Sequence, residues 1–259
     1  MHLQTLAAVD LLSYRQHLIN VEQRRPATVN KRLQALRWLC RWAQHQGIVE
    51  ADPAAELKSM RVARRRQPAG LTEPEVHALL RLAGASRKGQ RHRNYAIVQL
   101  LLQTGLRVGE LVNLEIGDIT LAARSGWIRV RLGKGELERE LPLNASARRA
   151  LRLYLDTRAK LSNRDPLFTS QQGEALSERS VQALIQTLAR RARLTRIPIS
   201  PHTLRHTFAL NYLQQNPGKL VELAHLLGHE SLDTTAIYTQ PAADDLARDL
   251  ERGRLNVYG

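Results

Sequence analysis

The chain has 259 residues, enough for two domains, and 43% of them are hydrophobic, enough to bury a sizeable core. No apolar run approaches the length of a membrane span, which excludes a membrane-spanning protein. The net charge of +15, from 39 Lys and Arg against 24 Asp and Glu, favours a nucleic-acid partner because phosphate neutralisation drives such association; the alternative is that a GC-rich genome has enriched Arg.

A single cysteine and the amino-terminal sequence indicate a cytoplasmic protein. Cys40 has no second cysteine to pair with, so no internal disulfide can form. The opening MHLQTLAAVDLL lacks a basic stretch ahead of its apolar residues and carries Asp10 early, so it makes a poor signal peptide. These features predict a reducing compartment and no membrane partner.

Residues 1–64 are predicted to form a short helical domain, because no strand alternation is present. Asp10 is the expected cap of a first helix that runs to about His17. Thr28 is the expected cap of a longer helix that Gly47 stops. The face of this helix opposite its apolar residues carries charges of one sign, which favours a DNA-facing surface over an ordinary solvated face. These basic residues are Lys31, Arg32, Arg37 and Arg41.

The segment RVARRRQPAG has no hydrophobic period and ends in Pro and Gly, which is typical of an interdomain linker. We place the linker at 65–70. Its arginines favour contact with a phosphate backbone, and the alternative is a linker that is merely soluble.

Residues 71–259 are predicted to form a mainly α-helical domain with a small antiparallel β-sheet. Thr72 and Glu75 can form a capping box at its first helix. The segment NYAIVQLLLQTG is apolar around most of its circumference, so it should be a buried central helix that ends at Gly105. Two strands, WIRVRL and LERELPL, lie within 126–143 and flank the hairpin connection GKGE.

Polar caps define the helices on either side of this hairpin. In LRVGELVNL, Arg107 and Glu110 should occupy the first turn of a helix, a favourable place for a phosphate oxygen because unpaired amides point there. Asn144 is the expected cap of a helix through Arg158, and Ser177 is the expected cap of a helix that ends in the basic run ARRAR.

The stretch from Pro201 to Gln240 combines apolar helical periodicity with a few polar groups that stand out from it. Gly228 should end a helix with a left-handed turn, which leaves His229 in a tight connection. Tyr238 should lie near the end of a short helix. Beyond it, an apolar stripe must be buried against the chain itself or against a neighbouring subunit. The stripe is Ala243, Leu246 and Leu250.

The polar residues of this half suit the cleavage of a phosphodiester by an attacking hydroxyl. The transition state gathers negative charge on the non-bridging oxygens, where Arg107 and Arg205 would supply paired forks. His202 and His229 would add hydrogen bonds, and either could handle the nucleophile's proton. Tyr238 would attack and form a phosphotyrosyl bond that conserves energy for rejoining.

Lys134, at the tip of the GKGE hairpin, is the candidate for the general acid. It could deliver a proton to the departing sugar oxygen. The alternative is a solubilising lysine. No metal or other cofactor is required by this set of residues.

Four patches together resemble the signature of the tyrosine recombinase family, the integrases and Xer-type recombinases. They are TGLRVGEL, the hairpin GKGE, PHTLRHTFA and LLGHESLDTTAIYTQ. The similarity covers roughly Leu71 to Gln240, and the segment TVNKRLQALRWLCRWAQHQGIVEADPA is similar to the last part of the family's helical core-binding domain.

The resemblance implies a metal-independent site around one DNA phosphate. It implies that Arg107 and Arg205 clamp the scissile phosphate, and that His202 and His229 assist as acid/base groups and phosphate ligands.

The resemblance also implies the covalent step and the assembly. Lys134 would protonate the leaving 5′ oxygen, and Tyr238 would form a 3′-phosphotyrosyl bond. Members of the family act on double-stranded DNA as a homotetramer on two sites and exchange strands through a Holliday junction. The helix after Tyr238 is implied to dock on the next protomer.

Two departures from the family pattern concern the ends of the domains. The amino-terminal domain is short, as though an initial helix were missing, which bears on whether it encircles DNA. No additional arm-binding domain and no large insertion before Pro201 are present, so the chain resembles simple, Xer-like recombinases.

Other functions remain open on the sequence alone. A DNA-binding protein without catalysis fits the charge, and a type IB topoisomerase uses similar chemistry. His202 and His206, and again His225 and His229, are four apart, as zinc-binding pairs on a helix are, but Arg205 would repel a cation.

Four further polar residues are interpreted as structural. His206 and His225 are expected to form hydrogen bonds in the core. Glu110 and Asp118 are expected to cap or pair, with support of the arginine cluster as the alternative role.

Overall fold

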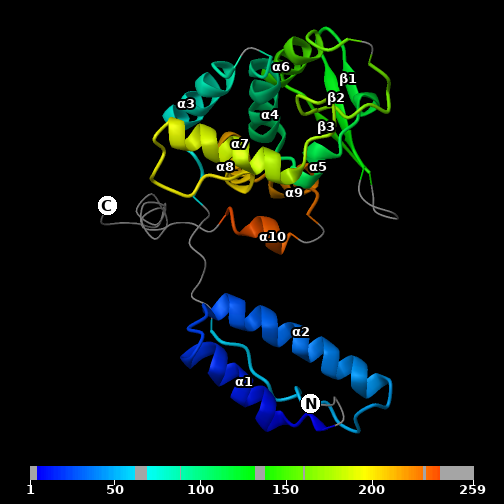
Figure 1. Cartoon of the computed structure of the whole chain (residues 1–259), viewed down its shortest axis with the longest axis vertical. Coiled ribbons are helices and arrows are strands. Elements are labelled where there is room, and N and C mark those ends of the chain that lie inside the picture. The colour runs from blue at the N-terminus through cyan, green and yellow to red at the C-terminus, as the bar shows by residue number, and fades with distance from the viewer. Residues whose placement is uncertain are drawn as a thin grey trace, which may run out of the picture. The chain divides into compact units, whose positions relative to one another are not determined.

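The computed structural model of the chain describes residues 5–61, 69–87, 89–131, 138–159, 161–229 and 232–239. It divides into two compact units, Met1–Arg66 and Gln67–Gly259, each described by itself (Figure 1). Across the described residues the fold is mainly α-helical with one three-stranded antiparallel sheet, as the sequence predicts. Within the same residues, no helix combines the length and apolarity needed to span a membrane.

The first unit is built on two helices, α1 (Ala8–Asn20) and α2 (Pro26–His45). They pack through apolar residues that recur at helical spacing and through the segment that follows α2. The buried residues of this cluster are Leu11, Leu18, Val29, Leu33, Cys40, Ala54 and Leu57.

Both helices of this unit begin earlier than predicted. Ala7 is the N-cap of α1, and the carboxylate of Asp10 accepts a hydrogen bond from the Ala7 amide at 2.9 Å, so Asp10 lies in the first turn. Pro26 opens α2, because its fixed φ and missing N–H suit the first helical position. Thr28 is therefore inside the helix and is not its cap.

The basic face of α2 is only partly available to a partner. Arg32 is 3.1 Å from the carboxylate of Glu22, and Arg37 donates to the carbonyl of Leu57 at 3.0 Å. The exposed side chains on the side of α2 opposite its core include two cations and two aromatic residues. They are Lys31, Trp38, Arg41 and Trp42.

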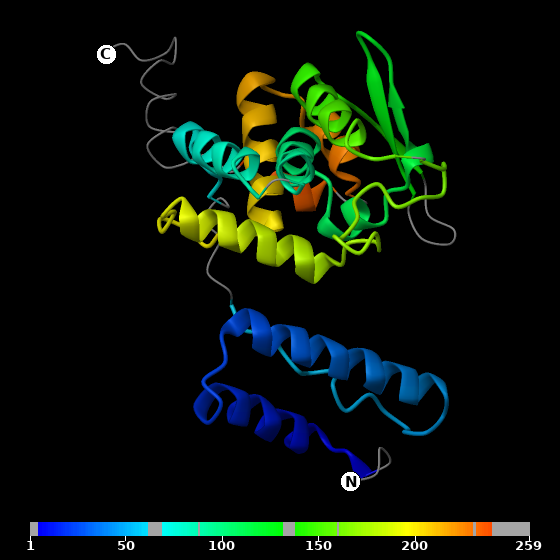
Figure 2. The same cartoon turned by 45° about the horizontal axis from the view of Figure 1, so that its top comes forward.

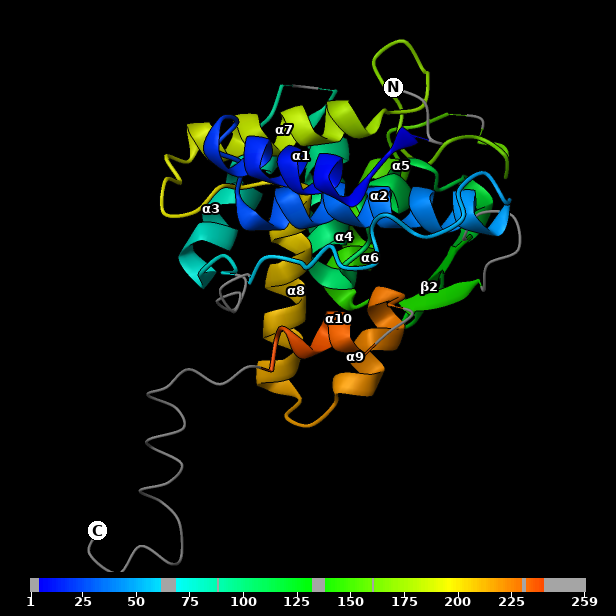
Figure 3. The ribbon, with the colours of Figure 1, turned by 90° about the horizontal axis from the view of Figure 1, so that it is seen from below.

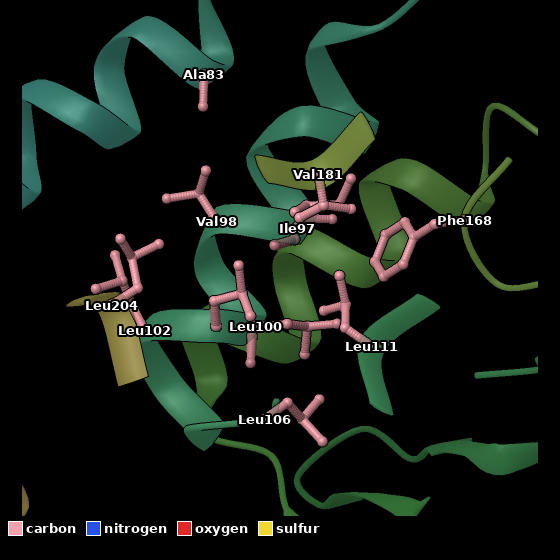
Figure 4. Close-up of a cluster of buried hydrophobic side chains, with 14 of the residues drawn as sticks. Ala83, Ile97, Val98, Leu100, Leu102, Leu106, Leu111, Phe168, Val181 and Leu204 are labelled. Carbon is pink, nitrogen blue, oxygen red and sulfur yellow. The ribbon is translucent and has the colours of Figure 1, made fainter. Parts of the chain in front are cut away.

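The second unit surrounds a central helix, α4 (Arg91–Thr104), whose side chains are buried on most sides (Figures 1 and 2). Its neighbours include α3, α6 and α8. Figure 4 shows Ile97, Leu111 and Phe168 within the core that results. The other helices are α3 (Glu73–Gly84), α5 (Val108–Val112), α6 (Ala145–Leu155), α7 (Glu178–Arg191), α8 (Pro201–Gln215), α9 (Leu220–Leu227), α10 (Asp233–Ala236) and the 3-10 turn η2 (Ile116–Asp118).

The sheet has the order β1-β2-β3 with antiparallel neighbours, from β1 (Ile119–Leu121), β2 (Gly126–Val130) and β3 (Arg139–Pro142). The two longer strands are those predicted, and Ile128 pairs with Leu141 in their register. β1 was not predicted, because three residues are too few to show alternation. The predicted hairpin tip with Lys134 lies outside the described residues.

The predicted caps of the second unit are mostly confirmed. Glu75 accepts from the Thr72 amide at 2.8 Å, and the side chains of Asn144 and Ser177 accept from amides of α6 and α7. However, α6 ends at Leu155, three residues before the predicted Arg158.

Gly105 ends α4 at a point where no other residue fits. Its φ is +66°, and a Cβ there would lie 2.9 Å from Leu227 Cδ2 and closer still to Phe208 Cδ1. The left-handed backbone costs a non-glycine residue about 1–2 kcal/mol, and overpacking adds about 1–3 kcal/mol. Gly105→Ala should therefore lower the free energy of unfolding by about 2–5 kcal/mol in urea denaturation.

A matched control separates the two costs of this substitution. Gly218 has a φ of +83° and no atom within 4 Å of an added Cβ. Gly218→Ala should therefore show the backbone cost alone, and equal losses in the two variants would contradict the packing argument.

Candidate active site

Arg205 lies at the centre of a cluster of polar groups where α8 meets the ends of α4 and α9. Its side chain is 3% exposed, and it donates to the carbonyls of Gly105 at 2.6 Å and Leu227 at 2.8 Å. Burial, aided by the nearby charge of Arg107, lowers the pKa of Arg205 to about 10, so it remains a cation at neutral pH. The helix ends thus hold one fixed positive charge.

His229 follows the left-handed Gly228, as predicted, and its ring is held on both nitrogens. Nε2 is 2.8 Å from Arg205 Nη2, and Nδ1 is 2.8 Å from Thr235 Oγ1. A guanidinium can only donate, so Nε2 must accept and the ring proton is on Nδ1, where it can donate to Thr235. Burial and the charge of Arg205 lower the pKa of His229 to about 4, which makes the ring neutral at pH 7.

Arg107, the N-cap residue of α5, binds a carbonyl next to one that Arg205 binds. Its Nη1 donates to Glu110 at 2.9 Å, and its Nη2 donates to the carbonyl of Gly228 at 2.8 Å. Arg205 binds the carbonyl of Leu227, the preceding residue. Two guanidinium groups from distant segments therefore meet on consecutive peptide units, and that of Arg107 is 45% exposed.

A buried ion pair between Glu110 and Arg139 supports this arrangement. Arg139, on β3, donates to both carboxylate oxygens of Glu110, at 2.9 and 2.8 Å, and to the carbonyl of Leu226 at 3.2 Å. A Cβ on Gly228 would lie 2.6 Å from Arg139 Nη1, so that glycine is required for the close approach. Burial raises the pKa of Glu110, but Arg139 and Arg107 outweigh it, and the net pKa lies below the ordinary value.

Arg139 was not predicted as a site residue, although the sequence carries a signal for it. In β3 the residues alternate between buried and exposed, and Arg139 occupies an inward position together with Leu141. A charge on the apolar side of a strand requires a buried partner. That pattern points to a polar contact, although it does not identify Glu110.

A pocket of about 380 Å³ opens beside the two arginines. Arg107, Arg205 and the exposed His202 line it, with Pro201 at the start of α8 and Glu178 at the start of α7. Glu110 also lines the pocket, but its carboxylate is paired with Arg107 and with a third arginine, Arg139. The cations and the helix amino terminus therefore favour an anion such as a phosphate at this place.

Tyr238 lies just after α10, buried against α8 and α9, which gather at one edge of the unit (Figure 3). It is 5% exposed, and its hydroxyl oxygen is 2.6 Å from His206 Nδ1. Burial raises the pKa of Tyr238, and the charge of Arg205 offsets only part of that rise. The phenol is therefore protonated at neutral pH.

The structure brings Arg107, His202, Arg205, His229 and Tyr238 into one region, whereas Lys134 lies outside the described residues. Three of the residues interpreted as structural have the expected contacts. Glu110 pairs with Arg139, Asp118 pairs with Arg131 at 2.6 Å, and His206 forms a hydrogen bond.

The prediction for His225 was wrong, because this histidine is exposed and not in the core. The zinc alternative has no support in the part of the chain that the structure describes. No group of three or more His, Cys, Asp or Glu side chains there could hold a metal ion.

Comparison with known proteins gives a consistent match. The model of the Phage integrase family matches residues 70–244. The chain is 37% identical to tyrosine recombinase XerC of Herpetosiphon aurantiacus over 242 residues, which is 91% of this chain and 76% of the relative. It is 34% identical to tyrosine recombinase XerD of Halalkalibacterium halodurans over 233 residues, 88% of this chain and 75% of the relative.

The fold is similar to that of a solved recombinase on DNA. A crystal structure of the XerH site-specific recombinase in a post-cleavage complex with palindromic difH substrate aligns with a TM-score of 0.78 and 26% sequence identity. The alignment covers 96% of this chain and 71% of that one.

Proposed function

Because the chain belongs to the phage integrase family of tyrosine recombinases, we propose that it recombines DNA at specific sites through a covalent bond between Tyr238 and a 3′ phosphate. The observation that carries this proposal is the convergence of Arg107 and Arg205 on the consecutive carbonyls of Gly228 and Leu227, beside an open pocket. Tyr238 reaches the same region from the following segment.

The proposed cleavage step depends mainly on fixed positive charge around the phosphate. Arg107 and Arg205 bind the non-bridging oxygens of the scissile phosphate and stabilise the charge that gathers there. His202, exposed at the pocket, adds a hydrogen bond. Tyr238 attacks phosphorus, and Lys134 gives a proton to the departing 5′ oxygen.

His229 needs a change of partner to take part as a phosphate ligand. Its Nε2 now accepts from Arg205, so it has no proton to donate in the pocket. An anionic phosphate nearby raises the pKa of the imidazole and favours a proton on Nε2. We therefore place His229 as a donor to phosphate only when DNA is bound.

The amino-terminal domain, residues 1–64, is proposed to bind duplex DNA, with a linker at 65–70 and the catalytic domain at 71–259. Its contact surface is the outer side of α2, where Lys31 and Arg41 are exposed with two tryptophans. Cations neutralise phosphates, and the indole rings cover the sugar edges without a charge of their own.

The complete reaction is proposed to need four copies of the chain. Strand exchange between two duplexes through a Holliday junction requires one active protomer at each cleavage position, and the apolar stripe of Ala243, Leu246 and Leu250 would join neighbours. The stripe lies outside the described residues. The protein would work in the cytoplasm, without a metal or nucleotide cofactor.

A nicked suicide site tests the proposed function. Cleavage releases a short fragment that carries the free 5′ hydroxyl, so a covalent protein–DNA adduct should accumulate on denaturing gels. Full duplexes should yield strands joined between two different molecules. Binding without an adduct would instead indicate a DNA-binding protein. An adduct that rejoins only its own duplex would indicate type IB topoisomerase chemistry.

A further inference from the structure

His206 touches the oxygen atom that the proposed function makes the nucleophile. Its Nδ1 lies 2.6 Å from the hydroxyl oxygen of Tyr238, a short hydrogen bond, and the two rings meet at 61° with centroids 5.4 Å apart. His206 belongs to α8, the helix that also carries Arg205 and His202. The contact therefore joins the tyrosine segment to the helix that lines the anion pocket.

The phenol can act as the donor in this hydrogen bond. Burial raises the pKa of Tyr238, so its hydroxyl holds its proton at neutral pH and can donate it. In the His206 tautomer that carries its proton on Nε2, Nδ1 accepts this hydrogen bond. The imidazole thus faces the phenol with the lone pair that a proton acceptor needs.

His229 is poorly suited to take this proton. His229 has a pKa lowered to about 4, first by burial and then by Arg205, which makes it a weak base. Its Nε2 accepts from Arg205 and its Nδ1 faces Thr235. The sequence predicts this role for either His202 or His229, whereas the structure places Nδ1 of His206 at the hydroxyl.

The position of His206 also suits a tyrosine that attacks a phosphate in the pocket. His202, one helical turn earlier, lines the pocket, and its ring lies edge-on to His206 with centroids 4.1 Å apart. The pocket, His202, His206 and Tyr238 thus follow one another along one face of α8. Among the described residues, the charged or titratable groups nearest the phenol are His206 and Arg205 on α8, with His202 behind His206 and His229 behind Arg205.

We propose that His206 is the general base that takes the proton of Tyr238 when the tyrosine attacks DNA. In this step the bond from the Tyr238 oxygen to phosphorus forms, the bond from phosphorus to the 5′ oxygen breaks, and the phenol proton moves to His206 Nδ1. The 5′ oxygen takes its proton from a separate acid, Lys134 in the proposed function. Rejoining reverses both transfers. This assignment rests on the proposed function.

Two variants at this position separate proton transfer from hydrogen bonding. His206→Ala removes both, whereas the amide oxygen of His206→Asn can accept the hydrogen bond but cannot hold a proton. With a suicide site in single turnover at pH 7, both variants should form the adduct about 10²- to 10⁴-fold more slowly than the wild type. The DNA affinity and the thermal unfolding midpoint of each variant show whether it is folded. If His206→Ala does not fold, His206→Asn alone tests the proposal.

The pH dependence of the cleavage rate distinguishes a general base from a residue with a structural role. Loss of a structural contact alone would not change that dependence. Without a base, cleavage depends on the small fraction of phenolate, which grows about tenfold per pH unit below the phenol pKa. The deficit of both variants should therefore shrink as pH rises from about 7 to 9. A deficit that stays constant with pH, or a wild-type rate in His206→Asn, would overturn the assignment.

A modified substrate distinguishes loss of the general base from loss of the general acid. A 5′-bridging phosphorothiolate leaves without a proton, so it should restore cleavage in Lys134→Ala but leave the deficit of His206→Ala unchanged. Restoration of both variants would refute His206 as the base. If the wild-type protein forms no adduct on any site, the proposed function itself fails, and that outcome is distinct from a normal adduct in the His206 variants.

Discussion

Tyr238→Phe should abolish the covalent adduct with DNA while leaving the fold and DNA binding in place. The substitution removes one hydroxyl and keeps the ring, which packs in a cluster with Ala209, Leu223 and Leu227. Because no other group can form the same covalent bond, the rate of adduct formation should fall by at least about 10⁴-fold. Loss of the hydrogen bond to His206 costs the fold about 0.5–1.5 kcal/mol at most.

Tyr212→Phe is a matched control for this variant. Tyr212 lies on α8 and packs against the same apolar cluster, so the substitution deletes an equivalent hydroxyl nearby. It should retain both adduct formation and strand joining on the suicide site. An adduct that survives in Tyr238→Phe, or disappears in both variants, would refute Tyr238 as the nucleophile.

Arg139→Met should be among the most destabilising substitutions in the second unit. It leaves the carboxylate of Glu110, whose side chain is 8% exposed, without the two hydrogen bonds from Arg139. Breaking one side of a buried ion pair typically costs about 3–5 kcal/mol, because the remaining charge stays buried. Chemical denaturation should show a loss of that size.

A double-mutant cycle tests whether this cost comes from the pair itself. Glu110→Leu combined with Arg139→Met removes both charges, so the double variant should be more stable than Arg139→Met alone. Simple addition of the two single losses would show that the side chains act independently. Glu110→Leu also removes the hydrogen bond, 2.9 Å long, that Arg107 donates to Glu110. Arg107, which lines the pocket, therefore loses a partner in this variant.

The contribution of Glu110 should disappear in acid. Arg139 and Arg107 outweigh the opposing effect of burial and depress its folded pKa below 4.5, so the stabilisation is present above about pH 4.5 and is lost as pH falls through the folded pKa. The difference in unfolding free energy between the wild type and Glu110→Gln should narrow over that interval. A difference that does not vary with pH would contradict the assigned pKa direction.

Local features of this fold were predictable because they depend on neighbours in sequence. The left-handed glycines 105 and 228 and the caps Asn144 and Ser177 follow from backbone geometry within a few residues. The wrong caps, Asp10 and Thr28, were also predicted from local sequence alone. Each lies a few residues after the true N-cap of its helix.

The contacts that organise the site connect segments far apart in the chain. Arg139 and Glu110 are 29 residues apart, and His206 and Tyr238 are 32 apart. Periodicity showed which residues are polar among apolar ones but not which partner each would find. The family resemblance indicated the pocket residues, whereas the supporting contacts required the packed structure.

The way in which Arg205 is held has a consequence for substrate capture. Peptide oxygens and an imidazole, rather than a carboxylate, hold this guanidinium within the described part of the chain. Glu110 and Glu178 line the same pocket, but neither carboxylate pairs with Arg205 among the described residues. For this guanidinium, the oxygens of an arriving DNA strand therefore compete with the uncharged acceptors that hold it.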